Sequence, residues 1–273
     1  MKIAVIGSNG MAGSMITSYL KKQKYSVTTF ARSNSDITMD IENVASLSGI
    51  KDTLIQFDYV INCIGLLVKD CIDRPDRAAI INSWFPHFLE HTLIDTNTIV
   101  VHLSTDCVFD GQTGHYKEKD IHTEMNAYGR SKSLGEINNS KDITFRMSII
   151  GPELKENGSG LLNFVLTNKS DTLNGFVDAY WNGITTLQLA KCIEQYIQTP
   201  KVTGVYHLVN NEFFINKYDL LCLINVVYGL NKTVRKSTGP KPVNKILLDT
   251  RLVVDWNIPD YKTQLLELKN YYH

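Results

Sequence analysis

Short runs of apolar residues alternate with longer, helix-length segments along the first half of the chain. The apolar runs predict buried strands at Lys2–Ile6, Ser26–Ala31, Tyr59–Ile64, Thr98–Leu103, Ile143–Ile149 and Val205–Val209. The segments between them predict helices at Met11–Lys22, Ile41–Ile50, Arg77–Leu93 and Ala127–Ile137. Because strands that are apolar throughout are buried on both faces, this alternation predicts an α/β protein with a doubly wound parallel sheet.

The chain beyond Gly151 has a different pattern, with loops rich in glycine, asparagine and serine. Helical periodicity returns at Thr186–Gln198 and at Asn216–Tyr228, and the second of these ends at Gly229, which suits a left-handed helix cap. We therefore expect a sheet domain over residues 1–150 and a smaller lobe over residues 151–273. The run Val205–Val209 is expected to return to the main sheet.

Composition and charge exclude several classes of protein. The 273 residues include 28 basic and 28 acidic side chains, so neither nucleic acid nor a membrane surface is an expected partner. Apolar runs stay well below the roughly 18 residues that a membrane span needs. The five cysteines are odd in number and form no Cys-x-x-Cys pair, which is typical of reduced thiols in a cytoplasmic protein.

A glycine-rich turn follows the first predicted strand. Gly7, Gly10 and Gly13 lie directly before an amphipathic helix. Glycine lets the backbone approach a pyrophosphate closely, and the helix N-terminus offers free N–H groups to the phosphates. A plain tight turn also needs glycine, but this position favours a dinucleotide-binding site of the Rossmann type.

The end of the second predicted strand indicates which dinucleotide binds. An acidic residue there would suit the ribose 2′-hydroxyl of NADH, whereas an arginine would suit the 2′-phosphate of NADPH. The sequence continues with Arg32 and has no acidic residue before Asp36. We therefore expect NADPH, with NADH as the alternative if Arg32 is only a solvated surface residue.

A tyrosine and a lysine four residues apart form the second chemical motif. Tyr128 and Lys132 would share one face of a helix, where the ammonium is expected to lower the pKa of the phenol. Such a tyrosine can donate or accept a proton. The same spacing recurs at Tyr228 and Lys232, but that pair spans the expected helix end at Gly229, and we interpret it as chance.

Polar residues also follow the buried strand that ends at Leu103. The chain continues Ser104-Thr105-Asp106, a combination that can simply cap a strand-end turn. Because parallel strands deliver their carboxyl ends to one edge of a sheet, Thr105 is expected near Tyr128 and the glycine turn. Its hydroxyl would hold a substrate carbonyl there.

Taken in order, these motifs resemble the extended short-chain dehydrogenases/reductases, and most closely the dTDP-4-dehydrorhamnose reductases. The resemblance is good over residues 1–165, and the stretches that carry it are Gly7 to Gly13, Ser104 to Gly111 and Tyr128 to Glu136, with further matches at Asn62, Asn82, Asn163 and Phe164. It implies NADPH-dependent reduction of a nucleotide-linked 4-keto-6-deoxy sugar, in deoxysugar biosynthesis for surface polysaccharide. It leaves the sugar and the nucleotide open.

The resemblance also implies roles for particular residues. The catalytic hydroxyl, tyrosine and lysine would be Thr105, Tyr128 and Lys132. The cofactor would also contact Gly7, Asn9, Gly10, Met11, Gly13, Arg32, Asp40, Ile41, Cys63, Ile64 and Gly65. Asp106 and Arg146 would face the sugar. The expected partners are a nucleotide-sugar substrate and a second copy of the chain in a homodimer.

We expect the lobe at 151–273 to bind substrate. Trp181 lies there in a polar stretch, Tyr180-Trp181-Asn182-Gly183, and its ring either packs on substrate or belongs to the core. We assign it to the substrate site.

Several departures from the reductase pattern keep other functions open. Cys63, Ile64 and Gly65 replace small, alanine-like residues, and Cys107 replaces an aromatic one. The first helix lacks the acidic side chains of a magnesium-linked dimer, so no metal is expected.

Two alternatives follow. One is a sugar-nucleotide epimerase or dehydratase on the same fold, although the glutamate of related dehydratases is missing after Asp106. The other is a cofactor-binding regulatory subunit without turnover, because the beta subunit of methionine adenosyltransferase shares this reductase-like sequence.

Overall fold

The computed structural model describes residues 1–154, 158, 160–199 and 202–272. Seven strands form its central sheet: β1 (Lys2–Ile6), β2 (Ser26–Ala31), β3 (Ile37–Thr38), β4 (Tyr59–Asn62), β5 (Ile99–Leu103), β6 (Ile143–Arg146) and β11 (Gly204–His207). Their order is β11-β6-β5-β4-β1-β2-β3, and every neighbouring pair is parallel. The strand order reverses between β1 and β4, which is where sheets of this kind bind ligands.

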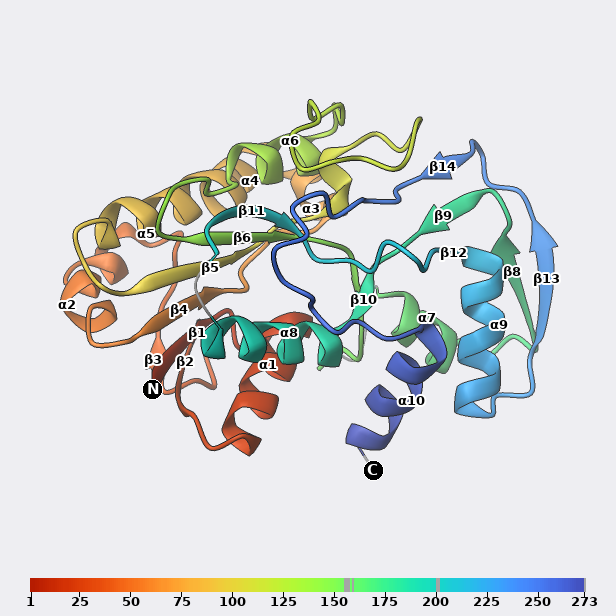
Figure 1. Cartoon of the computed structure of the whole chain (residues 1–273), viewed down its shortest axis with the longest axis horizontal. Coiled ribbons are helices and arrows are strands. Elements are labelled where there is room, and N and C mark those ends of the chain that lie inside the picture. The colour runs from red at the N-terminus through yellow and green to blue at the C-terminus, as the bar shows by residue number, and fades with distance from the viewer. Residues whose placement is uncertain (155–157, 159, 200–201, 273) are drawn as a thin grey trace.

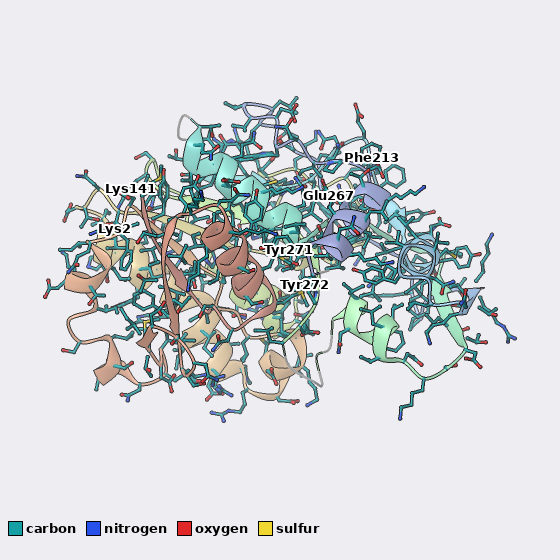
Figure 2. The ribbon with its side chains drawn as sticks, turned by 90° about the horizontal axis from the view of Figure 1, so that it is seen from below. Lys2, Lys141, Phe213, Glu267, Tyr271 and Tyr272 are labelled. Atoms are coloured by element: carbon teal, nitrogen blue, oxygen red, sulfur yellow. The ribbon has the colours of Figure 1, made fainter. Side chains whose placement is uncertain are left out.

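Helices cover both faces of this sheet, which confirms the predicted doubly wound α/β fold (Figure 1). One face carries α1 (Met11–Lys22) and α8 (Thr186–Gln198), which lie side by side in the view from below (Figure 2). The other face carries α2 (Ile50–Leu54), α3 (Val68–Asp73), α4 (Pro75–Ala78), the π-helical turn η2 (Ala79–Trp84), α5 (Phe85–Leu93) and α6 (Ala127–Leu134).

Each face of the sheet has its own apolar core. Side chains of a strand alternate between the two faces, so Ile3 and Val5 enter one core while Ala4 and Ile6 enter the other. All four are 0% exposed. Burial on both faces explains why these strands read as continuous apolar runs in the sequence.

A second group of elements lies beyond one end of the sheet, at the right of Figure 1. It contains two short sheets, β8 (Thr172–Phe176) with β13 (Thr233–Ser237), and β9 (Ala179–Trp181) between β12 (Ile215–Asn216) and β14 (Val243–Asn244). The helices α7 (Leu161–Thr167), α9 (Lys217–Tyr228) and α10 (Tyr261–Tyr271) accompany them. Near the junction with the main sheet, β7 (Ile149–Ile150) pairs with β10 (Ile184–Thr185).

The later chain also contributes to the main sheet, as expected. The strand expected at Val205–Val209 forms as β11 and pairs with β6. Helix α8 then covers the same face as α1, and Tyr271 of α10 reaches α1, where its hydroxyl lies 3.0 Å from Ser18 Oγ (Figure 2). The boundary at residue 150 stays a prediction.

Several element boundaries differ from the expectation. The helix expected at Ile41–Ile50 is replaced by a 3-10 turn, η1 (Val44–Leu47), and by α2, which begins after Gly49. Gly49 has φ of +73°, a left-handed conformation that interrupts a helix. The expected strand at Ile143–Ile149 is divided into β6 and β7.

Two expected helices also have different limits. The one expected at Arg77–Leu93 forms as α4, η2 and α5 in succession, and it begins at Pro75. The one expected at Ala127–Ile137 ends at Leu134. Gly135 follows, and a Cβ there would lie 1.8 Å from the Asn82 carbonyl oxygen. The chain therefore leaves the helix at a point of close backbone contact.

Candidate active site

The glycine turn between β1 and α1 has the geometry of a phosphate cradle. Gly7 has φ of +82°, and a Cβ there would lie 2.9 Å from Ile64 Cγ1. A Cβ on Gly13 would lie 2.2 Å from the Gly7 carbonyl oxygen, so both positions require glycine. The N–H groups of Met11 and Ala12 make no hydrogen bond within the described residues. The turn therefore presents free donors at a helix N-terminus, which fits a pyrophosphate.

The ends of β2 and β4 flank this turn, as the sequence predicted. Cys63 donates its N–H to the Ile6 carbonyl at 2.9 Å, and the next residue packs on Gly7. Asn9 Nδ2 donates to the Ser33 carbonyl at 2.6 Å, which ties the glycine turn to the segment that carries Arg32. Arg32 is exposed and directly follows β2.

The two residues of the predicted pair Asp40-Ile41 lie in different environments, Ile41 in the core and Asp40 near the surface. Ile41 is 5% exposed and belongs to the core of the face that carries α5. Asp40 Oδ1 accepts the N–H of Glu42 at 3.1 Å. The structure therefore gives Ile41 a packing role and leaves the Asp40 carboxylate near the surface.

Thr105 lies at the carboxyl end of β5, at the start of the 3-10 turn η3 (Asp106–Val108). Its Oγ1 accepts the N–H of Cys107 at 3.1 Å and donates to Asp106 Oδ1 at 3.2 Å. The hydroxyl also lies near Tyr128, where it opposes the rise in the tyrosine pKa that burial causes. The two interpretations of this stretch therefore coexist, because Thr105 caps a turn and also faces the candidate catalytic tyrosine.

Tyr128 and Lys132 lie on α6, which packs tightly against this turn. Asn126 caps the helix by accepting the N–H of Gly129 at 2.9 Å, and a Cβ on Gly129 would lie 2.4 Å from the Cys107 carbonyl oxygen. Lys132 is 4% exposed, and its Nζ donates to the Leu103 carbonyl at 2.7 Å. The structure thus brings Thr105, Tyr128 and Lys132 together at the end of β5.

The pKa of Tyr128 is raised overall in this structure, not lowered. Burial raises the pKa of Tyr128 above its ordinary value, opposed by the Thr105 hydroxyl. Lys132 is not among the largest influences on this pKa, and its Nζ donates to the Leu103 carbonyl. Burial also lowers the pKa of Lys132 to about 8. Tyr128 is therefore protonated at neutral pH, the form that donates a proton.

Asp106 is buried beside Thr105, close to two lysines from the second group of elements. It is 4% exposed, and burial raises the pKa of its carboxyl while the charges of Lys245 and Lys217 oppose that rise. Lys245 Nζ also donates to the Phe109 carbonyl and lies 3.6 Å from Glu124 Oε2. Asp106 thus lies where the main sheet meets the later chain.

The surroundings of Arg146 favour a structural role over the expected contact with the sugar. Arg146 is 1% exposed and pairs with Glu136 through two hydrogen bonds, 2.8 Å from Nε and 2.6 Å from Nη2. The third nitrogen, Nη1, donates to His207 Nε2 at 2.7 Å, and Nη2 also donates to His122 Nε2 at 2.8 Å. Its donors are consumed inside the protein, so Arg146 is a structural ion-pair partner.

The surroundings of Trp181 likewise favour the core over the substrate site to which we assigned it. Trp181 is 7% exposed, belongs to the core that faces α1, and stacks on Tyr261 with ring centroids 5.8 Å apart. A Cβ on Gly183 would lie 2.2 Å from Trp181 Cζ2. The ring is therefore a packing element that fixes β9 against α10.

A family model for the RmlD substrate binding domain matches residues 1–245. The chain belongs to this family. Methionine adenosyltransferase 2 subunit beta of Xenopus tropicalis is 20% identical over 254 residues, covering 88% of this chain and 75% of that protein. The spore coat polysaccharide biosynthesis protein SpsK of Bacillus subtilis is 28% identical over 255 residues, covering 89% and 85%.

A solved structure has the same fold over the whole chain. The dTDP-4-dehydrorhamnose reductase of Bacillus anthracis, in complex with NADP, superposes with a TM-score of 0.85 at 19% identity and covers 100% of this chain and 99% of its own. The likeness confirms the fold of this RmlD family member. Among the described helices, none is both long and apolar enough to cross a lipid bilayer.

Sequence reasoning gave no role to two buried polar residues of the site. Asn62 and His102 are both 0% exposed, on β4 and β5, and His102 Nε2 lies 3.5 Å from Lys132 Nζ. The signal was present, because each is a polar residue inside an otherwise apolar run. The described residues contain no cluster of three or more His, Cys, Asp or Glu side chains arranged to hold a metal.

Proposed function

We propose that this member of the RmlD substrate binding domain family is an NADPH-dependent reductase of a nucleotide-linked 4-keto-6-deoxy sugar. The observation that carries the proposal is the meeting of Thr105, Tyr128 and Lys132 at one strand end, beside the glycine turn. Sugar-nucleotide reduction also agrees with SpsK, a polysaccharide biosynthesis relative, and with the fold of the Bacillus anthracis reductase.

Each residue of the site has a separate role in the proposed reaction. When bound, NADPH supplies the hydride. Thr105 hydrogen-bonds to the substrate carbonyl oxygen and Tyr128 donates a proton to that oxygen, a contribution of roughly 10²–10⁴ in rate. Lys132, held near the end of β5, would contact the nicotinamide ribose, and the N–H groups of Met11 and Ala12 would bind the pyrophosphate.

Arg32 sets the preference for NADPH in this proposal. Its exposed guanidinium follows β2, and no acidic residue lies beside it before Asp36. Replacing Arg32 with alanine should cost about 1.5–3 kcal/mol of NADPH binding, because a charge-assisted contact to the 2′-phosphate is lost. NADH binding should change little. Titration calorimetry with both cofactors tests this, and equal affinities in the unmodified protein would refute the assignment.

The reaction itself is tested by NADPH oxidation with a panel of 4-keto-6-deoxy nucleotide sugars. The panel varies the base and the sugar separately, so that the specificity for the base and the specificity for the sugar are measured independently. We expect turnover with at least one member, dependent on Tyr128. Consumption of 4-keto substrates without net NADPH oxidation would instead favour an epimerase on the same fold.

A regulatory role is the second candidate. It is favoured by the methionine adenosyltransferase beta subunits, which align with 88% of the chain. Tight NADPH binding together with no turnover across the panel would support it. In that case Tyr128→Phe should leave the regulatory effect of the protein unchanged, because that effect requires no proton transfer.

A further inference from the structure

Two polar side chains are buried beneath the candidate active site on neighbouring strands. Asn62 ends β4, His102 lies on β5, the two are paired in register, and both are 0% exposed. The strand residues around them, such as Ile61 and Val101, are apolar. Burying a polar side chain costs free energy unless its hydrogen bonds are made, so the partners of this pair are informative.

The hydrogen bonds fix the position of the proton on His102. The backbone N–H of Ile64 donates to Asn62 Oδ1 at 3.2 Å, which turns the Asn62 amide nitrogen toward the imidazole. Asn62 Nδ2 then donates to His102 Nδ1 at 3.2 Å. An imidazole that is neutral and accepts at Nδ1 carries its proton on Nε2. Burial and the charge of Lys132 hold the pKa of His102 well below its ordinary value, so the ring is neutral.

The Nε2–H of His102 therefore faces Lys132 Nζ at 3.5 Å. Against an ammonium, this contact places one donor against another. Against a neutral amine, it is a hydrogen bond to the nitrogen lone pair. The contact consequently favours the neutral amine, in the same direction as burial.

We propose that His102 is a positioning residue for Lys132, oriented by Asn62 so that its Nε2–H favours the neutral amine and holds it against β5. The proposal rests on the proposed function, in which Lys132 acts in the reaction. It goes beyond that function because it assigns the protonation state of the lysine to two strand residues that are fully buried.

Other groups also act on this lysine and must be separated from His102. Glu136 on the same helix, Cys71 on α3 and Cys63 after β4 all favour the ammonium, while burial opposes it. His102 itself feels the charges of Lys132 and of His87 on α5. Substitutions at Asn62 and His102 leave all four of the other side chains in place.

The first test reads the tautomer directly. In the unmodified, histidine-labelled protein, ¹⁵N NMR should show a protonated Nε2 and an unprotonated Nδ1 for His102, assigned by its loss in His102→Gln. A protonated Nδ1 would overturn the proposal. This measurement requires no substrate, and the tautomer itself is read in the unmodified protein.

The second test is a double-mutant cycle on the pKa of Lys132, measured by NMR of lysine-labelled protein and assigned with Lys132→Met. In Asn62→Asp, the new carboxylate can accept a hydrogen bond from Nδ1–H of His102. The imidazole proton then moves from Nε2 to Nδ1, and Nε2 becomes an acceptor for the Lys132 ammonium. We expect the pKa of Lys132 to rise by about one unit or more. His102→Gln alone should shift it little, because the amide can still donate.

The cycle separates the tautomer from the added charge. In a His102→Leu background the side chain at 102 neither donates nor accepts a hydrogen bond, so Asn62→Asp can act only through its charge, and the rise should be less than half as large. Equal rises in both backgrounds would overturn the proposal, and melting curves show that each variant is folded. Because these readouts need no substrate, they stay independent of the keto-sugar panel, whose failure would refute the proposed function alone.

Discussion

The chain contains the sequence Tyr-Gly-x-x-Lys twice, and the two copies have different structures. In the first, Tyr128 and Lys132 both lie within α6, and the lysine is buried at the end of β5. In the second, Tyr228 is the last residue of α9, and Gly229 has φ of +65°. Lys232 lies beyond the helix, where its Nζ donates to the Asn168 and Ser170 carbonyls at 2.7 and 2.8 Å.

This comparison shows what a spacing of four residues does and does not establish. Side chains four apart share a face only while the helix continues through both of them. A left-handed glycine ends α9 between its tyrosine and lysine, whereas Gly129 is helical and lies against the Cys107 carbonyl. The same letters therefore make a catalytic candidate in one place and a helix cap in the other, as the sequence predicted.

The largest expected difference between the copies is in catalysis. Tyr128→Phe should lower kcat by roughly 10²–10⁴, because the phenol is the proposed proton donor. Tyr228→Phe is the matched control and should leave kcat within about twofold, since surface or packing hydroxyls away from the site contribute little to the chemical step. Both rates come from NADPH oxidation with the active keto sugar.

Cofactor binding decides between a chemical and a structural effect of Tyr128→Phe. The variant should retain the melting temperature of the unmodified protein and bind NADPH with nearly unchanged affinity. An inactive Tyr228 variant beside an active Tyr128 variant would reverse the assignment of the two copies.

The first half of the fold was predictable because its signals are local. Each of the strands β1, β2, β4 and β5 is buried on both faces, so its apolar run is visible without knowledge of its partners. The short strands of the second group, such as β12 (Ile215–Asn216) and β14 (Val243–Asn244), contain two residues each. Such strands are defined by partners far away in the sequence, and their own residues carry no periodic pattern.

The residues of the candidate site also differ in how well the sequence could predict them. The glycine turn, Thr105 and Tyr128 were predicted because their roles depend on backbone position at a strand end or on a helix. The surroundings of Arg146 and Trp181 could not be predicted, because they come from distant residues, namely His207 for the arginine and Tyr261 for the tryptophan. The position of a residue in a motif does not reveal whether its hydrogen-bond donors are already paired with other groups of the protein.

The two lysines should differ in stability as well as in activity. Lys132→Met removes a buried cation and should raise the free energy of unfolding by about 1–2 kcal/mol at pH 7, while abolishing activity. Lys232→Met removes two hydrogen bonds to backbone carbonyls and should lower the free energy of unfolding by about 1–2 kcal/mol, with activity retained. Denaturant titration of both variants measures the difference, and a destabilised Lys132 variant would contradict this account.

The pH dependence of the Lys132 effect has a definite sign. The pKa of Lys132 is lowered to about 8 in the folded chain, from an ordinary value of 10.5. Between these values the unfolded chain holds a proton that the folded chain has released, so this lysine's contribution to stability rises with pH. The advantage of Lys132→Met should therefore be fully present below pH 8 and should disappear toward pH 10.5.

The smallest expected difference concerns the glycine in each copy. Gly229→Ala meets no atom within 4 Å, so its cost is that of a left-handed alanine, about 1 kcal/mol, with activity unchanged. Gly129→Ala places a Cβ 2.4 Å from the Cys107 carbonyl oxygen, and a backbone atom cannot move aside as a flexible side chain can. It should cost about 1–3 kcal/mol. Because α6 must shift to accommodate it, Tyr128 moves relative to Thr105, and kcat should fall while the Gly229 variant keeps its full rate. Equal kcat values in the two variants would show that close packing of α6 on η3 does not position the tyrosine.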